Sequence, residues 1–132
     1  MTVQTTQSSQ RVLVMEDEFY IADTLVDALS AAGLEAVGPA YSLSQALRYI
    51  ESTADIRGAI LDINLKNQLA FPAADALSSR QIPFLITTGY DPQQLEERFR
   101  HIVCFVKPFD PEKVVAKLQN EMSCKQDLTS NS

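Results

Sequence analysis

The sequence contains only two cysteines, Cys104 and Cys124. Their spacing matches neither a metal site nor a disulfide framework. No hydrophobic run approaches the roughly 18 residues that a membrane-spanning helix needs. The first ten residues also lack the charged and apolar regions of a signal peptide. These absences predict a soluble, cytoplasmic protein that is not inserted in a membrane.

Basic residues are also scarce, since 11 lysines and arginines stand against 17 aspartates and glutamates, for a formal net charge of −6. A protein that binds nucleic acid needs a surface that neutralises phosphates. The charge balance therefore argues against a nucleic-acid partner. With 132 residues, of which 45% are hydrophobic, the chain is expected to form one domain with a real core and short tails.

Short apolar runs alternate five times with segments of helical periodicity, which predicts five strands, each followed by a helix. Strands that are apolar throughout are typical of a parallel sheet covered on both faces. We therefore predict an α/β domain over residues 11–122, with a doubly wound five-stranded parallel sheet and flexible tails at 1–10 and 123–132. The expected strands are 11–15, 35–40, 58–61, 84–87 and 103–106. The expected helices are 20–32, 42–50, a segment opened by Pro72, a short segment from Pro92, and 111–122.

Polar residues mark where several of these helices begin. Ser42 and Gln45 have the spacing of a capping box, in which each side chain accepts a hydrogen bond from the backbone near the other. Asp110 is the expected N-cap of the last helix, and Asp91 of the short fourth helix. These signals support the predicted order of strands and helices.

Acidic residues gather where the first and third strands end. Ligands of open α/β sheets bind outside the carboxyl ends of the strands, and there the sequence has Glu16, Asp17 and Glu18, then Asp62. Two carboxylates about 4 Å apart repel each other by about 4 kcal/mol at an effective dielectric constant of 20, so a positive partner is expected. Mg²⁺ suits such a site, with Asp17 and Asp62 as candidate ligands. Glu18 by itself fits a solvated charge at a helix N-terminus.

Asp62 follows an apolar strand and is expected at the edge of the core, where burial and a metal would tune its pKa. A carboxylate can attack phosphorus to form an aspartyl phosphate. Thr88 and Lys107 follow the fourth and fifth strands and would supply a hydroxyl donor and a positive charge to phosphoryl oxygens. Separately, each is typical of a turn or of a solvated surface. Their joint placement favours a phosphoryl-acceptor site at Asp62.

Four segments, VLVMEDE, AILDINL, PFLITTGY and CFVKPF, resemble in order, spacing and residue type the receiver domain of bacterial two-component response regulators. The resemblance extends over about residues 11–118. It implies a flavodoxin-like (CheY-like) sheet with strand order 2-1-3-4-5 and five helices. The TGY ending and the DINL segment are similar to single-domain receivers that are common in alphaproteobacteria.

The resemblance also implies the roles of the acidic residues. Asp62 matches the phosphoacceptor, Asp17 a direct Mg²⁺ ligand, and Glu16 the acidic neighbour that acts through water. Asn64 matches the residue whose backbone carbonyl completes the metal site. The family more often has Asp where Glu16 stands, and the longer side chain is expected to shift the site.

By the same resemblance, Thr88 is the switch hydroxyl that moves to meet the phosphoryl group, and Lys107 pairs with that group. The peptide before Pro108 is often cis in the family. Cys104 stands where many members have a Tyr or Phe that turns inward on activation, so the usual aromatic relay is in doubt. Tyr90 is a candidate to take part of that role.

The resemblance implies a single-domain response regulator that accepts a phosphoryl group on Asp62 from a histidine kinase or a histidine phosphotransfer protein, with Mg²⁺. The signal would leave through the face of the fourth helix, fifth strand and fifth helix, or by onward phosphotransfer. Residues 119–132 are too few for a helix-turn-helix output module. A phosphate-sink role and a homodimer stay open. The alternatives are a receiver-fold interaction module that works without phosphorylation, and an aspartyl-phosphate phosphatase.

The chain is not expected to be an enzyme. A phosphatase of this kind needs a general acid two residues after the nucleophile, and Asn64 stands at that position. Slow self-dephosphorylation is expected instead, with Asn64 and Tyr90 beside the path of the water. A flavodoxin-like cofactor binder would need a phosphate loop rich in Ser, Thr or Gly after the first strand. The residues there are EDE, which repel phosphate.

Overall fold

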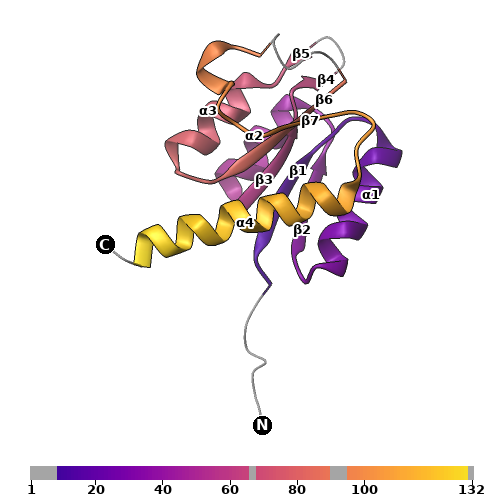
Figure 1. The fold of residues 1–132 in the computed structure, drawn as a ribbon. Helices are drawn as coiled ribbons and strands as arrows, with labels where there is room; N and C mark the ends of the chain where they lie inside the picture. The colour runs from indigo at the N-terminus through magenta and orange to yellow at the C-terminus, as the bar shows by residue number, and fades with distance from the viewer. Residues whose placement is uncertain (1–8, 66–67, 90–94, 131–132) are drawn as a thin grey trace.

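The computed structural model describes residues 9–65, 68–89 and 95–130. Its centre is a parallel sheet of five strands (Figure 1). In spatial order these strands are β2 (Glu35–Ala40), β1 (Arg11–Met15), β3 (Ile56–Asp62), β6 (Phe84–Thr88) and β7 (Cys104–Val106). Counted along the chain within this sheet, that is the order 2-1-3-4-5. The predicted flavodoxin-like, doubly wound sheet is confirmed.

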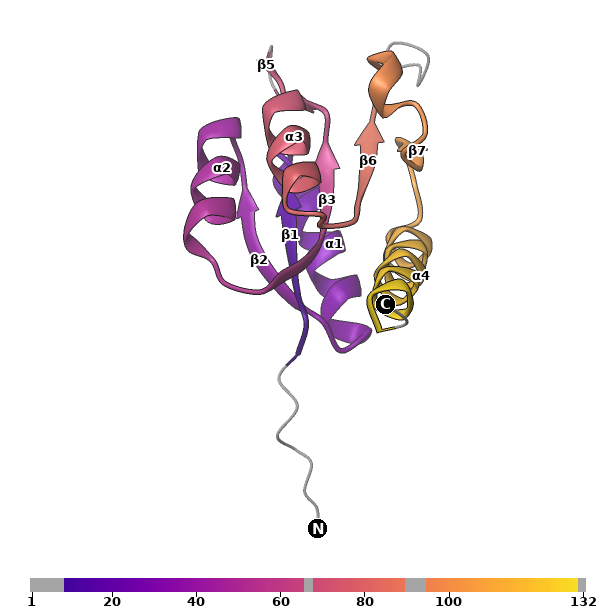
Figure 2. The ribbon, with the colours of Figure 1, turned by 90° about the vertical axis from the view of Figure 1, so that its left-hand side faces the viewer.

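A pair of helices covers each face of the sheet, as Figure 2 shows. α1 (Phe19–Ala31) and α4 (Pro111–Ser130) lie on one face, and α2 (Leu43–Ser52) and α3 (Phe71–Ser79) lie on the other. Successive side chains of a strand point to opposite faces. In β1, Val12 packs under α1 and α4, whereas Leu13 packs under α2 and α3. Because both faces are buried, the strands are apolar throughout, as the sequence pattern predicted.

Side-chain caps fix the starts of two helices. Ser42 Oγ accepts a hydrogen bond from the Gln45 N–H at 3.2 Å, and Gln45 Oε1 accepts one from the Tyr41 N–H at 2.7 Å. The capping box predicted before α2 is therefore present, with Tyr41 as the second donor. Asp110 Oδ1 accepts from the Glu112 N–H at 2.9 Å, which confirms the cap of α4.

The prediction of five helices was wrong for the described residues, which contain four α-helices. The predicted cap Asp91 and the start at Pro92 lie outside the described residues. The part of this segment that the structure describes forms only the 3₁₀-helix η3 (Glu97–Phe99). Phe99 is buried and stacks on Phe71, with ring centroids 5.4 Å apart. This contact anchors the segment to α3 in a tight turn, and little chain is left before β7 for a longer helix.

α4 continues to Ser130, past residue 122, where the predicted domain ended and the predicted C-terminal tail began. Its first part packs on the sheet through Val114, Leu118 and Met122, which are buried. No proline or glycine follows Pro111 in the helix to end it. In the described residues, no helix combines the length and the apolar character that a membrane crossing needs.

The loop that follows β3 contains a short antiparallel pair that the sequence did not predict. β4 (Asn64–Leu65) pairs with β5 (Gln68–Leu69). The Ala70 N–H donates to the Ile63 carbonyl at 3.0 Å and closes the base of this loop. The pair therefore holds Asn64 close to the carboxyl end of β3.

Candidate functional site

The five parallel strands end beside one another at one edge of the sheet (Figure 2). Met15 is in register with Leu61, Asp62 with Thr87, and Thr88 with Val106. The residues that end or follow these strands therefore meet at this edge. Among them are the predicted site residues Glu16, Asp17, Asp62, Thr88 and Lys107.

Lys107 joins the two buried acids of the site. Glu16 and Asp62 are 0% and 2% exposed. The Lys107 Nζ lies 2.8 Å from Asp62 Oδ2 and 3.1 Å from Glu16 Oε1. The backbone N–H of Lys107 donates to the Thr88 carbonyl at 2.7 Å, and the peptide between Lys107 and Pro108 is cis. β7 and its bond to β6 thus place the lysine over Asp62, as predicted.

Backbone donors orient the carboxylates. The Asn64 N–H donates to Asp62 Oδ1 at 3.0 Å, and the Glu18 N–H donates to Glu16 Oε2 at 3.0 Å. Glu18 itself stands at the N-cap of α1 but makes no side-chain cap there. Its Oε1 lies 3.3 Å from Lys107 Nζ, although its side chain is 63% exposed. The interpretation of Glu18 as a helix-terminal charge was therefore incomplete, because the residue also belongs to the lysine cluster.

Burial raises the pKa values of both buried acids in this cluster. Burial, together with the charge of Asp62, raises the pKa of Glu16 from 4.5 to about 7. Burial likewise raises the pKa of Asp62, although hydrogen bonds from Lys107 and Asn64 oppose the rise. For Lys107, burial acts to lower the pKa, but the hydrogen bonds and charges of Asp62 and Glu16 outweigh it and the pKa is raised. The lysine is thus held in its charged form.

The acids also have the arrangement of a magnesium site. Glu16, Asp17 and Asp62 each offer an oxygen, and these oxygens lie within 4.8 Å of one another. Among the described residues, Glu16 Oε1 accepts no hydrogen bond of good geometry. Carboxylate oxygens are the ligands that Mg²⁺ prefers. The residues present therefore fit this ion. The role of the Asn64 backbone carbonyl stays a prediction.

Two adjacent threonines end β6, and sequence reasoning singled out only one of them. Thr88 is 2% exposed and its hydroxyl role stays a prediction. Thr87 is 1% exposed, and its Oγ1 has no hydrogen-bond partner among the described residues. A pattern of two threonines at a strand end does not say which one shares a face of the sheet with Asp62. The register with Asp62 provides the missing information.

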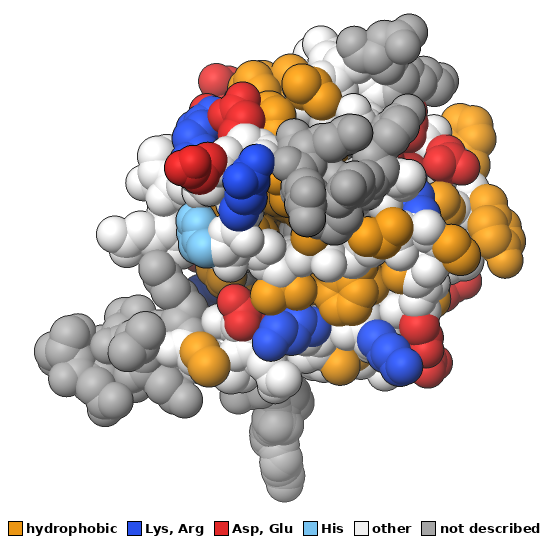
Figure 3. Space-filling model, turned by 45° about the horizontal axis from the view of Figure 1, so that its top comes forward, with side chains coloured by type: hydrophobic (Ala, Val, Ile, Leu, Met, Phe, Trp, Pro, Cys, Tyr) orange, Lys and Arg blue, Asp and Glu red, His pale blue; other side chains and the backbone are white. Residues whose placement is uncertain are grey.

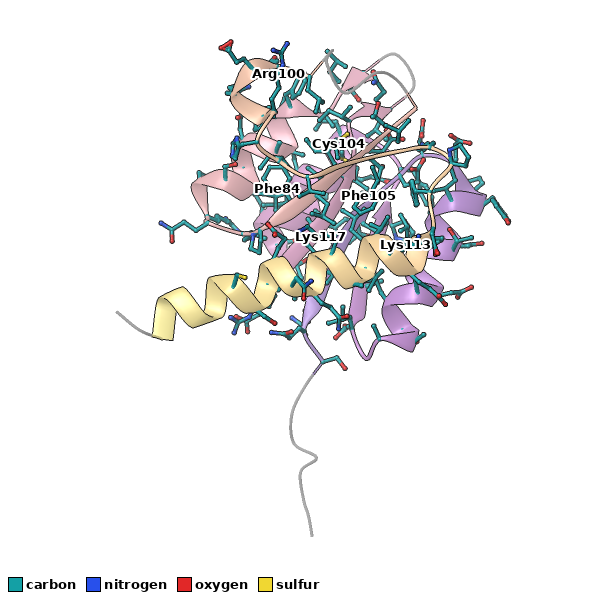
Figure 4. The ribbon with its side chains drawn as sticks, viewed as in Figure 1. Phe84, Arg100, Cys104, Phe105, Lys113 and Lys117 are labelled. Carbon is teal, nitrogen blue, oxygen red and sulfur yellow. The ribbon has the colours of Figure 1, made fainter. Side chains whose placement is uncertain are left out.

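Cys104 occupies the position where an aromatic switch residue was expected. Figure 4 labels it on β7 next to Phe105. Cys104 packs against the hydrophobic cluster under α2 and α3, and Phe105 packs against the one under α1 and α4. The nearest aromatic side chain of this strand therefore faces the opposite side of the sheet. Tyr90, the other candidate for the aromatic role, lies outside the described residues.

A surface hollow of about 590 Å³ opens beside Lys107, at the border of the site. Glu18, Tyr20, Gly89 and Phe109 also line it. Figure 3 shows this end of the molecule, where acidic and basic side chains are mixed with hydrophobic ones. The side chain of Lys107, which lines the hollow, is 15% exposed, so this residue connects the buried acids of the site with the surface.

Comparison with models of known protein families and with curated protein sequences gave no match. Solved structures did match. SdrG from Sphingomonas melonis Fr1 is 34% identical, with a TM-score of 0.75 over 89% of this chain and 98% of that chain. A structure of the BeF₃-activated conformation of SdrG from Pseudomonas melonis Fr1 is 36% identical, with a TM-score of 0.67 over 84% of this chain and 94% of that chain.

Two further solved structures that match are a response regulator and a response regulator receiver domain protein. The response regulator PhyR from Brucella abortus is 26% identical, with a TM-score of 0.75 over 96% of this chain and 54% of that chain. A CheY-like response regulator receiver domain protein from Methanospirillum hungatei JF-1 is 22% identical, with a TM-score of 0.78 over 91% of this chain and 98% of that chain, and it shows the fold alone. The sheet order, the site at the strand ends and these matches lead to one conclusion: the chain belongs to the CheY-like receiver domains of response regulators.

Proposed function

We propose that this receiver domain is a phosphorylation switch that accepts a phosphoryl group on Asp62. The observation that carries the proposal is the position of Asp62. Its carboxylate is buried at a strand end, accepts hydrogen bonds from Lys107 and the Asn64 N–H, and lies beside two further acids that fit a magnesium ion. The Lys107 ammonium group contacts carboxylates in the described part of the chain, and its charge also suits phosphoryl oxygens.

The reaction needs little beyond positioning and charge. An oxygen of Asp62 forms a bond to phosphorus while the bond from phosphorus to the donor breaks, and the donor keeps the electron pair. The Asn64 N–H orients the attacking carboxylate, and Lys107 faces the arriving negative charge. Asp17, Asp62 and the Asn64 carbonyl would hold Mg²⁺ directly, and Glu16 would hold it through a water molecule. The bound ion would neutralise charge on the phosphoryl oxygens. Hydrolysis reverses the state when water attacks phosphorus and releases inorganic phosphate.

The partners follow from this chemistry. A histidine kinase or a histidine phosphotransfer protein would donate the phosphoryl group, and a second protein would bind the altered domain or take the group onward. The BeF₃-activated conformation of SdrG supports the proposal, because trifluoroberyllate on a carboxylate mimics a phosphoryl group. We place this activity in the cytoplasm. We propose a signalling domain and not a turnover enzyme, because Asn64 offers no general acid to the acyl phosphate.

Intact mass spectrometry after incubation with acetyl phosphate and Mg²⁺ tests this function. The wild-type protein is expected to gain one phosphoryl group. Asp62→Asn should gain none, and wild type without Mg²⁺ or Asp17→Asn should gain much less. Asp27→Asn, which changes an exposed acid of α1, is the matched control and should be labelled like wild type. Full labelling of Asp62→Asn would overturn the site, and no labelling of wild type would favour a phosphorylation-independent interaction module.

A further inference from the structure

Thr87 carries a buried hydroxyl group that the function described so far does not use. The residue is 1% exposed, and its Oγ1 has no hydrogen-bond partner among the described residues. A buried hydroxyl without a partner costs about 1–3 kcal/mol of stability. Valine has nearly the same shape and would avoid this cost. A threonine here therefore indicates that the hydroxyl has a partner in another state of the protein.

The register of the sheet identifies that partner. Asp62 on β3 and Thr87 on β6 are directly paired, and their side chains therefore lie on the same face of the sheet. The preceding pair on this face, Ile60 and Leu85, lies in one hydrophobic cluster under α1 and α4. The Ile63 N–H donates to the Thr87 carbonyl at 3.1 Å and fixes the two strands next to Asp62. The residue that carries the unused hydroxyl is thus the neighbour of Asp62 on the adjacent strand, on the same face of the sheet.

In the free protein both oxygens of Asp62 are already bonded, one to Lys107 and the other to the Asn64 N–H. A phosphoryl group adds three strong acceptor oxygens, so the phosphorylated site needs more donors than the free site. We infer that the Thr87 hydroxyl is one of them, and that it donates a hydrogen bond to the aspartyl-phosphate group at Asp62. This inference rests on the proposed function. Thr87 would approach the group from the face of α1 and α4, whereas Thr88 approaches from the other face.

Titration with beryllofluoride in the presence of Mg²⁺, followed by fluorine NMR, tests this role on the full chain. Thr87→Val removes the hydroxyl and keeps the shape, and we expect it to bind the probe about tenfold more weakly than wild type. Thr87→Ser keeps the hydroxyl and should bind like wild type. Thr53→Val, at the C-terminal end of α2, is the matched control and should leave the affinity unchanged.

Thermal unfolding of the free variants separates this role from a structural one. Since the hydroxyl has no hydrogen-bond partner among the described residues, Thr87→Val should have a Tm equal to or above that of wild type. The inference is overturned if Thr87→Val binds beryllofluoride as tightly as wild type, if Thr87→Ser is as weak as Thr87→Val, or if the free Thr87→Val protein is destabilised. Failure of the wild-type protein to bind the probe would overturn the proposed function and this inference with it.

Discussion

Two clusters of opposite charges in this protein have similar contacts and very different surroundings. In one, Lys107 contacts Asp62 and Glu16, and the three side chains are 15%, 2% and 0% exposed. In the other, Arg98 contacts Asp75 and Glu96, and these side chains are about half exposed, at 52%, 49% and 47%. Proximity of charge is therefore common to both clusters, and burial distinguishes them.

Burial changes what the charges do. In the Lys107 cluster it raises the pKa of Glu16 to about 7, so a carboxyl group there can hold a proton or exchange it for a cation near neutral pH. In the Arg98 cluster, the hydrogen bond to Asp75 raises the pKa of an arginine that is already charged at every physiological pH. The buried cluster can therefore exchange a proton or a cation near neutral pH. In the exposed cluster, the Arg98 guanidinium group lies over the Phe99 ring.

The largest contrast is expected when each cation is removed. Lys107→Met should slow phosphorylation by acetyl phosphate about 100-fold, because a preorganised charge on the reacting oxygens is lost. Arg98→Met, the matched change in the exposed cluster, should be phosphorylated at the wild-type rate. Time courses of intact mass give both rates, and circular dichroism checks that each variant is folded. If phosphorylation were slowed equally in Lys107→Met and Arg98→Met, the burial of the Lys107 cluster would not explain its role in the reaction.

The stability of the segment that contains Arg98 should depend more on the buried ring of Phe99 than on the charges of the exposed cluster. Phe99 is 4% exposed and lies between Phe71 and Phe84, with ring centroids 5.4 and 6.4 Å away. Phe99→Ala should lower the free energy of unfolding by about 3–5 kcal/mol, as measured by urea denaturation. Phe19→Ala is the control, because Phe19 is 68% exposed. A similar loss in both variants would contradict the anchoring role of Phe99.

The buried cluster also predicts how stability depends on pH. A carboxyl whose pKa is raised in the folded protein holds its proton more tightly there than in the unfolded chain. The resulting stability is fully present below pH 4.5 and is lost as the pH rises through about 7. In magnesium-free buffer Glu16 should account for a loss of about 3 kcal/mol over this range.

Denaturation at a series of pH values measures this loss. Glu16→Gln replaces the carboxyl group with an amide that does not titrate. The unfolding free energy of this variant should therefore fall less steeply with pH than that of wild type. Glu51→Gln, a change of an exposed glutamate on α2, should keep the wild-type slope. An unchanged slope in Glu16→Gln would show that the buried carboxyl is not the titrating group.

The smallest effect is expected from the charges of the exposed cluster. Arg98→Met should change the Tm only slightly, because exposed ion pairs contribute little to stability and salt screens them. The difference from wild type should shrink further as the salt concentration is raised. A large destabilisation that persists in high salt would mean that the contact of Arg98 with the Phe99 ring, 4.4 Å from the centroid, matters more than its charge.

The sequence predicted the meeting of Glu16, Asp17, Asp62 and Lys107 because parallel strands expose their carboxyl ends at one edge. Apolar runs locate those ends closely, and the residues that follow them are then known. The sequence did not predict that Glu16 lies directly against Lys107, because the length and burial of a side chain decide that contact. The role inferred for Thr87 needed the strand register, since a shift of one residue would turn the other threonine toward Asp62.

Two elements of the structure differ from the local sequence pattern for a common reason. α4 continues to Ser130 although the polar stretch after Met122 has no apolar periodicity, because a helix already packed on the sheet extends without a residue that breaks it. From residue 95 to β7, where the structure describes the chain again, the helical element is the short η3, because Phe99 packs into the core and fixes a tight turn. In both places tertiary packing decided an element that local pattern described poorly.

The most direct test of the account is to locate the phosphoryl group. Borohydride reduces an aspartyl phosphate to homoserine, so peptide mass spectrometry after phosphorylation and reduction identifies the acceptor. We expect conversion at Asp62 alone, dependent on Mg²⁺ and on the phosphoryl donor. Conversion at Asp17 or another acid of the cluster, with Asp62 unchanged, would contradict the central claim that Lys107 and the strand ends make Asp62 the acceptor.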